Sequence, residues 1–325
     1  MKFNSLIPGA LALGLTVTPV LASEPVLYTS NPVPAVEAVQ AAVHESAGTD
    51  LGVITGGSGV LLRRIEAEAD APQGDVFWST SINTVGAFKS NFEAYSSPEL
   101  AAVKESLRYP DDLFQPANIH VVTMLVNSYL LDGAEMPGSW ADLADPAWKG
   151  RVMIPDPANS STGYTIAWGL SKLLDQETFE AVVSNLVISG SSSAVPRGVA
   201  MGEYAVGLTF ETNGYAYVDG GQEELQLVYP AEGTFITADY SGLVQNAPAG
   251  ENAKKVIDTL MSKETQTELL MVAFRRPSRT DIKVSDYVGL PELGDIKIFD
   301  VDEGEAATSR EDFLAKWATL PKAGS

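Results

Sequence analysis

Four short loops of small polar residues are the parts of this chain best suited to chemistry. All four carry serine or threonine hydroxyls, and three of them also carry glycine or asparagine. Three follow predicted strands, and the fourth opens a predicted helix. The first turn of a helix has unpaired N–H groups and a partial positive charge, so such a loop can hold an anion. A single loop is explained more simply as a helix cap, but four in one chain favour a shared ligand. The ligand-binding residues predicted from these loops are Ser30, Asn31, Ser58, Gly59, Ser79, Thr80, Ser160, Ser161, Thr162 and Gly163.

Charged and aromatic side chains in the second half of the chain add further candidates. Glu211 and Asn213 follow a predicted strand and can hold an ammonium, a hydroxyl or a metal, although Glu211 can also simply cap the next helix. Tyr240 is a candidate for the rim of the same site. Arg276 belongs to a cluster of three arginines, and its planar guanidinium suits a carboxylate or a phosphate, although it can also offset nearby acids.

Motifs of the common enzyme classes are absent from the sequence. It has no Gly-x-x-x-x-Gly-Lys phosphate loop, no His-Glu-x-x-His and no Gly-x-Ser-x-Gly. The count of cysteines is 0, which rules out disulfides, thiol nucleophiles and cysteine-ligated clusters. His44 falls in a predicted helix and His120 just before a predicted strand, where we expect structural roles. We therefore expect a binding protein with no catalytic residue and no cofactor; a secreted phosphate-ester hydrolase is the alternative from another class.

Composition excludes several partners. The 325 residues are 45% hydrophobic, which is typical of a globular chain, and the length suggests two domains. Lysine and arginine number 21 against 42 aspartates and glutamates, so the net charge is −21. This charge repels nucleic-acid backbones and anionic lipid headgroups. We expect no nucleic-acid partner and no stable membrane insertion.

The first 22 residues have the pattern of a secretory signal peptide. Met1-Lys2 is followed by an apolar stretch from Leu6 to Leu15 and by the small-residue pattern Val20-Leu21-Ala22. The apolar stretch is too short to span a bilayer. We therefore expect cleavage after Ala22 and a soluble mature protein in the periplasm.

Strand-like and helical segments alternate through the mature chain, which predicts an α/β fold with largely parallel pairing. Strands are predicted at 26–29, 51–55, 75–78, 121–126, 151–154, 204–210, 225–229 and 241–246. Helices are predicted at 34–46, from 56–59 onward, after the 156–163 loop to 174, and at 177–186, 251–261 and 265–274. The segment from Thr280 is acidic and less regular.

The ordered set of these segments resembles the periplasmic substrate-binding proteins of ABC importers, in the branch that binds ferric ion, phosphonates and sugar phosphates. The resemblance rests on 26–30, 57–68, 74–78, 148–152, 156–165, 207–211 and 229–234. It implies a two-lobed type II binding-protein fold, in which each lobe is a mostly parallel sheet with helices on both faces. Lobe 1 is expected at 23–121 plus 236–325 and lobe 2 at 122–235, with strands crossing near His120–Thr123 and Gly233–Thr237. It also implies a small-molecule ligand in the cleft, a membrane permease as partner and a monomeric protein.

The sequence departs from the ferric pattern of this branch. Ferric binders carry adjacent tyrosines after the strand that here ends at Phe210, and the corresponding positions hold Thr212 and Asn213. Hydroxyl and amide groups are weaker ligands for Fe³⁺ than phenolates. The preferred ligand is therefore a small organic anion, a phosphonate or phosphate ester, with any amine met by Glu211. The ferric alternative stays open through Tyr215, Tyr217 and Tyr240.

Overall fold

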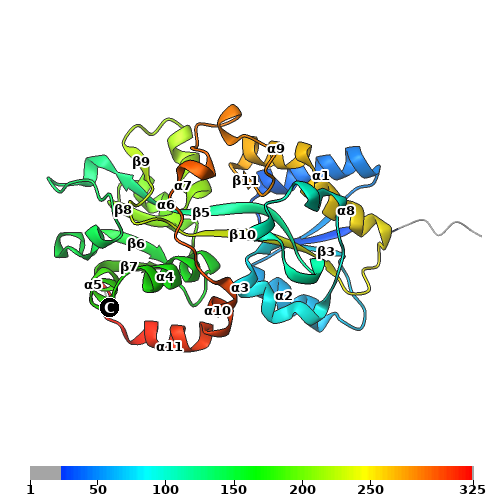
Figure 1. The fold of residues 1–325 in the computed structure, drawn as a ribbon, viewed down its shortest axis with the longest axis horizontal. Helices are drawn as coiled ribbons and strands as arrows, with labels where there is room; N and C mark the ends of the chain where they lie inside the picture. The colour runs from blue at the N-terminus through cyan, green and yellow to red at the C-terminus, as the bar shows by residue number, and fades with distance from the viewer. Residues whose placement is uncertain (1–22, 324–325) are drawn as a thin grey trace, which may run out of the picture.

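The computed structural model describes residues 23–323. The expected signal peptide at 1–22 lies outside these residues. Figure 1 shows two lobes side by side, joined through the middle by long strands. No helix between residues 23 and 323 has the length and hydrophobicity needed to cross a bilayer.

The first lobe is built on three parallel strands, β1 (Val26–Thr29), β2 (Gly52–Thr55) and β3 (Val76–Thr80), with β1 in the centre. Helices lie above and below this sheet in Figure 1. Its core gathers large apolar side chains such as Phe77, Trp78 and Leu62, all at most 1% exposed. The helices of this lobe are α1 (Val33–Ala47), α2 (Ser58–Ala67), the short α3 (Ile82–Val85), α8 (Glu251–Met261) and α9 (Lys263–Ala273). A short strand, β4 (Phe92–Glu93), pairs with β10 (Ile236–Val244).

The second lobe repeats this plan with β6 (Val152–Pro155), β7 (Leu186–Ser189) and β8 (Val206–Phe210), which are parallel. A fourth strand, β9 (Leu225–Val228), pairs with the long strand β5 (Gln115–Asn127). Its core is a separate cluster around Trp140, Ile154 and Leu208. The helices here are α4 (Ser161–Leu173), α5 (Gln176–Asn185), α6 (Ala194–Ala200) and α7 (Glu211–Asp219).

Two long strands cross between the lobes. β5 (Gln115–Asn127) pairs with β10 (Ile236–Val244) up to Val121 and with β8 from Val122 onward. The resulting strand order is β2-β1-β3-β10-β5-β8-β6-β7, and β11 (Arg276–Pro277) adds to β5. The pairing confirms the expected fold class and the crossings. β5 is longer than the strand predicted there because it pairs in both sheets, and β10 also begins before the strand predicted there.

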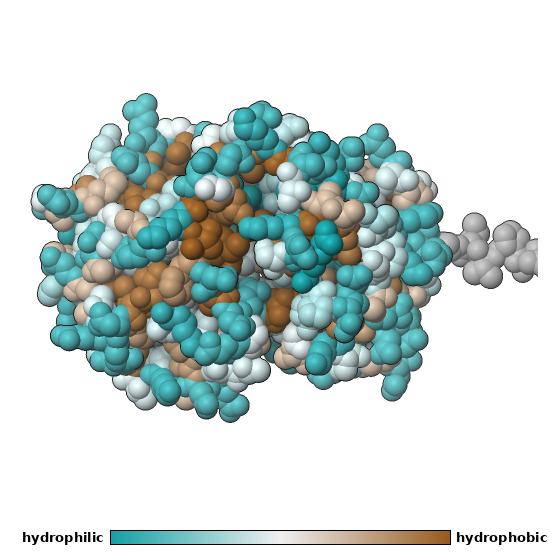
Figure 2. Space-filling view, in the orientation of Figure 1, coloured by the Kyte–Doolittle hydropathy of each residue, from teal (hydrophilic) through white to brown (hydrophobic). Residues whose placement is uncertain are grey.

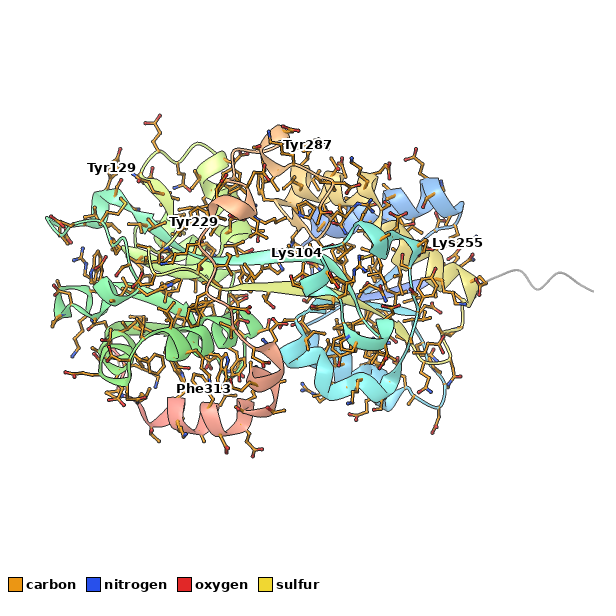
Figure 3. All side chains as sticks on the ribbon, viewed as in Figure 1. Lys104, Tyr129, Tyr229, Lys255, Tyr287 and Phe313 are labelled. Carbon is orange, nitrogen blue, oxygen red and sulfur yellow. The ribbon has the colours of Figure 1, made fainter. Side chains whose placement is uncertain are left out.

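The end of the chain corrects the expected lobe boundary. The segment 236–325 was expected in lobe 1, but α11 (Arg310–Thr319) runs along the second lobe, and α10 (Glu303–Thr308) lies between the lobes, where it packs against α3 (Figure 1). Phe313 on α11, labelled in Figure 3, makes edge contacts with Tyr164 and Trp168 of α4. Trp317 packs near Phe179. Apolar side chains on the last helix therefore join the core of the second lobe, which the acidic composition of this segment concealed.

Hydrophilic side chains cover most of the face drawn in Figure 2, with smaller apolar patches between them. This surface agrees with the large excess of acidic residues in the chain.

Candidate functional site

Three serines converge where the parallel strands of the first lobe end. Ser30 follows β1, Ser58 opens α2 and Ser79 lies near the end of β3. Ser58 Oγ is 2.8 Å from Ser79 Oγ and 3.2 Å from Ser30 Oγ, and Ser30 also bonds Ser79. No side chain of the described residues caps α2, and no atom lies within 4 Å of where a Cβ on its N-cap, Gly57, would be. The structure thus brings together three of the loop residues predicted to bind an anion. We call Ser30, Ser58 and Ser79 the serine cluster.

The other candidates in the first lobe are placed differently. Thr80 is 2% exposed, and its hydroxyl has no hydrogen-bond partner within residues 23–323. The Asn31 amide donates to Thr29 Oγ1 at 3.2 Å and to the Trp78 carbonyl at 3.3 Å, so Asn31 fixes the loop. The hydroxyl of Tyr240 donates to the Leu107 carbonyl at 2.9 Å inside the first core. Burial raises the pKa of this phenol, and the prediction of Tyr240 as a rim residue is wrong.

The loop before α4 in the second lobe is mainly structural. Ser160 Oγ accepts the Gly163 N–H at 3.2 Å, so Ser160 is the N-cap of α4. A Cβ on Gly163 would lie 2.2 Å from the Pro155 carbonyl oxygen, so this glycine is required by packing. Ser161 is half-buried and Thr162 is buried in the first turn. The helix nevertheless faces the first lobe, because Asn83 Nδ2 donates to Thr165 Oγ1 of α4 at 3.4 Å.

Glu211 and Arg276 form a buried ion pair between the lobes. Arg276 Nη2 lies 2.7 Å from Glu211 Oε1, and Arg276 Nε lies 3.1 Å from Oε2. The Tyr229 hydroxyl also donates a hydrogen bond to Glu211. Arg276 is 1% exposed and Glu211 is 0% exposed. Both were predicted to touch ligand; instead, each neutralises the other. Glu211 therefore has no free oxygen for a ligand's ammonium group.

A cavity of about 270 Å³ lies between the lobes. One wall comes from the loop after β1 and the end of α9, and the other comes from α6 and α7. Asn213, a predicted site residue, lines it. The lining residues are Pro32, Pro34, Ser193, Pro196, Thr212, Asn213, Ala216, Tyr217, Val272, Ala273, Phe274 and Arg275.

Arg275 is the charged residue of this cavity, and it belongs to the arginine cluster from which Arg276 was the predicted site residue. It is 8% exposed, and its Nη1 lies 3.2 Å from His120 Nδ1 and 2.8 Å from His120 Nε2. His120 Nε2 is also 3.0 Å from Asp239 Oδ2. An arginine side chain can only donate hydrogen bonds. A neutral His120 therefore fits between Asp239 and Arg275 when its Nε2–H donates to the Asp239 carboxylate and its Nδ1 accepts from the Arg275 guanidinium.

Burial lowers the pKa of His120, although the nearby Asp239 opposes this shift. Burial likewise lowers the pKa of Arg275, again against Asp239. Both pKa values are lowered because burial disfavours the charged form of each side chain. The signal for Arg275 was the pair Arg275-Arg276 itself, because neighbours in an extended segment point to opposite sides.

The three tyrosines of the ferric alternative do not meet. The Tyr215 hydroxyl accepts the Gly289 N–H at 3.0 Å, Tyr217 lines the cavity and Tyr240 lies in the first core. Among residues 23–323 no group of three or more histidine, aspartate and glutamate side chains is placed to hold a metal. The expected tyrosine set is therefore not assembled in this structure.

Comparison with known proteins agrees with this architecture. The family model described as "Bacterial extracellular solute-binding protein" matches residues 74–293. A Salmonella typhi protein named "Putative 2-aminoethylphosphonate-binding periplasmic protein" is 26% identical over 256 residues, covering 74% of this chain and 73% of that protein.

Two solved structures share the fold. The periplasmic binding protein AfuA from Actinobacillus pleuropneumoniae, solved with fructose-6-phosphate, aligns with a TM-score of 0.82 and 25% identity over 91% of this chain and 98% of that one. Iron-bound HitA from Pseudomonas aeruginosa aligns with a TM-score of 0.80 and 19% identity over 91% and 99%, which shows the fold alone. The chain belongs to the bacterial extracellular solute-binding protein family.

Proposed function

We propose that this solute-binding protein captures a small organic anion carrying a phosphonate or phosphate-ester group in the cleft between its lobes. The observation that carries the proposal is the serine cluster at the uncapped start of α2. Three hydroxyls and the first-turn N–H groups offer several donors to one tetrahedral anion, and the helix dipole favours negative charge there.

Capture works through the two crossing strands. A ligand that contacts the serine cluster of one lobe and the facing surface of the other lobe stabilises the closed arrangement over the open one. The crossing of β5 and β10 confines the relative motion of the lobes to the hinge. We infer that a membrane permease of an ABC importer recognises the closed form, that the mature monomer acts in the periplasm after signal cleavage, and that the ligand leaves unchanged.

The phosphonate relative and the sugar-phosphate-bound structure support an organic anion. The iron-bound neighbour shares the fold, but the dispersed tyrosines of this chain favour the organic ligand.

A thermal-shift screen of the mature protein tests this function. Phosphonates, phosphate esters and Fe³⁺ with a carrier anion are each added at the same concentration. A ligand present at 100 times its Kd stabilises the folded state by about 2.7 kcal/mol, which is a shift of several degrees in Tm. Ser58→Ala and Ser79→Ala should reduce the shift, whereas Ser184→Ala, a helical serine of the second lobe, serves as the matched control. A shift with Fe³⁺ alone would overturn the proposal, as would release of product from any ester.

A further inference from the structure

Arg275 carries a charge that the protein leaves incompletely paired. Nε of Arg275 is buried and has no hydrogen-bond partner within residues 23–323. The carboxylate of Asp239 is 4.0 Å from Nη1 and is already bonded by His120. The neighbouring buried carboxylate, Glu211, is occupied by Arg276. A buried donor without an acceptor costs free energy, so this edge of the guanidinium has an unmet need for an anion.

A second hydrogen-bond donor lines the cavity between the lobes to which Arg275 belongs. The hydroxyl of Thr212 is buried without a partner, and the residue is 4% exposed. Thr212 lies in the first turn of α7, a helix of 9 residues whose N-cap, Phe210, offers no side-chain cap. Arg275 and Thr212 come from opposite walls of the cavity, one from the chain after α9 and the other from α7. Arg275 and Thr212 therefore line one cavity from its two sides, and each keeps a buried polar atom without a partner among the described residues.

We propose that this cavity binds a second acidic group of the ligand, a carboxylate, held by Arg275 and Thr212. The inference rests on the proposed function and narrows its ligand to an organic phosphonate or phosphate ester that also carries a carboxylate. The planar pair of oxygens in a carboxylate matches the fork of a guanidinium, whereas the hydroxyls of the serine cluster suit a tetrahedral group. A cavity of about 270 Å³ admits only a small acid.

The same arrangement disfavours an ammonium group. Arg275 repels a cation in the cavity, and Glu211, the acid expected to receive an amine, is fully buried against Arg276. The protein should therefore distinguish ligands of equal length by the charge at the end remote from phosphorus.

Calorimetric titration with three matched phosphonates tests the inference. 3-Phosphonopropionate carries a carboxylate, 2-aminoethylphosphonate carries an ammonium and propylphosphonate carries neither. We expect the carboxylate compound to bind the wild-type protein about 10- to 100-fold more tightly than propylphosphonate, the range typical of hydrogen bonds to charged groups. We expect the ammonium compound to bind more weakly than either.

Variants assign this preference to residues. Arg275→Gln should abolish the advantage of the carboxylate compound and leave propylphosphonate affinity within about threefold, because only the former uses the guanidinium. Arg197→Gln removes the same charge from an exposed position on α6 and should change neither. Thr212→Val removes only the unpartnered hydroxyl, so it keeps the test valid if Arg275→Gln does not fold.

The titrations distinguish failure of the carboxylate site from failure of the proposed function. Equal affinities for 3-phosphonopropionate and propylphosphonate, or tighter binding of 2-aminoethylphosphonate, overturn the carboxylate site while the phosphonate function stands. An unchanged preference in Thr212→Val and Arg275→Gln overturns the assignment of the site. Binding of none of the three overturns phosphonate capture as the proposed function and this inference with it.

Discussion

The ion pair between Glu211 and Arg276 should be among the most sensitive points of the structure. Glu211→Ala leaves the Arg276 guanidinium buried, at 1% exposure, with the Pro291 carbonyl at 2.8 Å as its one remaining acceptor among the described residues. Breaking a buried pair from one side costs about 3–5 kcal/mol, because the remaining charge is uncompensated. At about 2 °C per kcal/mol for a chain of this size, Tm should fall by roughly 6–10 °C.

Thermal unfolding followed by circular dichroism measures this loss. Asp132→Ala is the control, because its pair with Arg151 is exposed and should contribute at most about 1 kcal/mol. The double variant Glu211→Leu with Arg276→Met should recover most of the stability, since an apolar pair of similar volume avoids the desolvation of both charges. Equal Tm values for Glu211→Ala and Asp132→Ala, or no recovery in the double variant, would refute the reasoning.

Three further predictions concern stability. Burial raises the pKa of the Glu303 carboxyl to about 7, above its ordinary value of 4.5. Between these two pH values the folded state binds more protons than the unfolded state, so the stability should fall as the pH rises from about 5 through 7. Glu303→Gln should flatten that slope of Tm against pH; an unchanged slope contradicts the assignment. Gly163→Ala should cost about 1–3 kcal/mol, because its Cβ meets the Pro155 carbonyl, whereas Gly86→Ala, where the nearest atom is 3.7 Å away, should be nearly neutral in urea unfolding. Trp317→Ala should cost about 3–5 kcal/mol, against little for the 77% exposed Tyr129→Ala, and equal urea midpoints would show that α11 is not part of the second core.

The serine cluster was predictable because parallel strands share one direction. Their carboxyl ends meet at one edge of the sheet, so Ser30, Ser58 and Ser79 had to come close once the strands were recognised. Most helices and strands were also predictable, because the periodicity of apolar residues within each segment determines its secondary structure.

Contacts between distant segments were not predictable. The choice between Arg275 and Arg276 depends on which side of a short extended segment each faces, and a shift of one residue reverses it. The partner of Arg276 lies 65 residues away, and nothing local in the sequence marks Glu211 as taken. Packing of α11 on the second lobe likewise depends on tertiary contacts of Trp317 and Phe313.

Calorimetric titration of the mature protein with propylphosphonate tests the central claim most directly. The account predicts saturable binding of one molecule per chain, weakened at least about tenfold in Ser58→Ala through the loss of a donor to a charged group and retained in Ser184→Ala. Absence of binding, or binding that Ser58→Ala leaves unchanged, would contradict the claim that the serine cluster holds the anion.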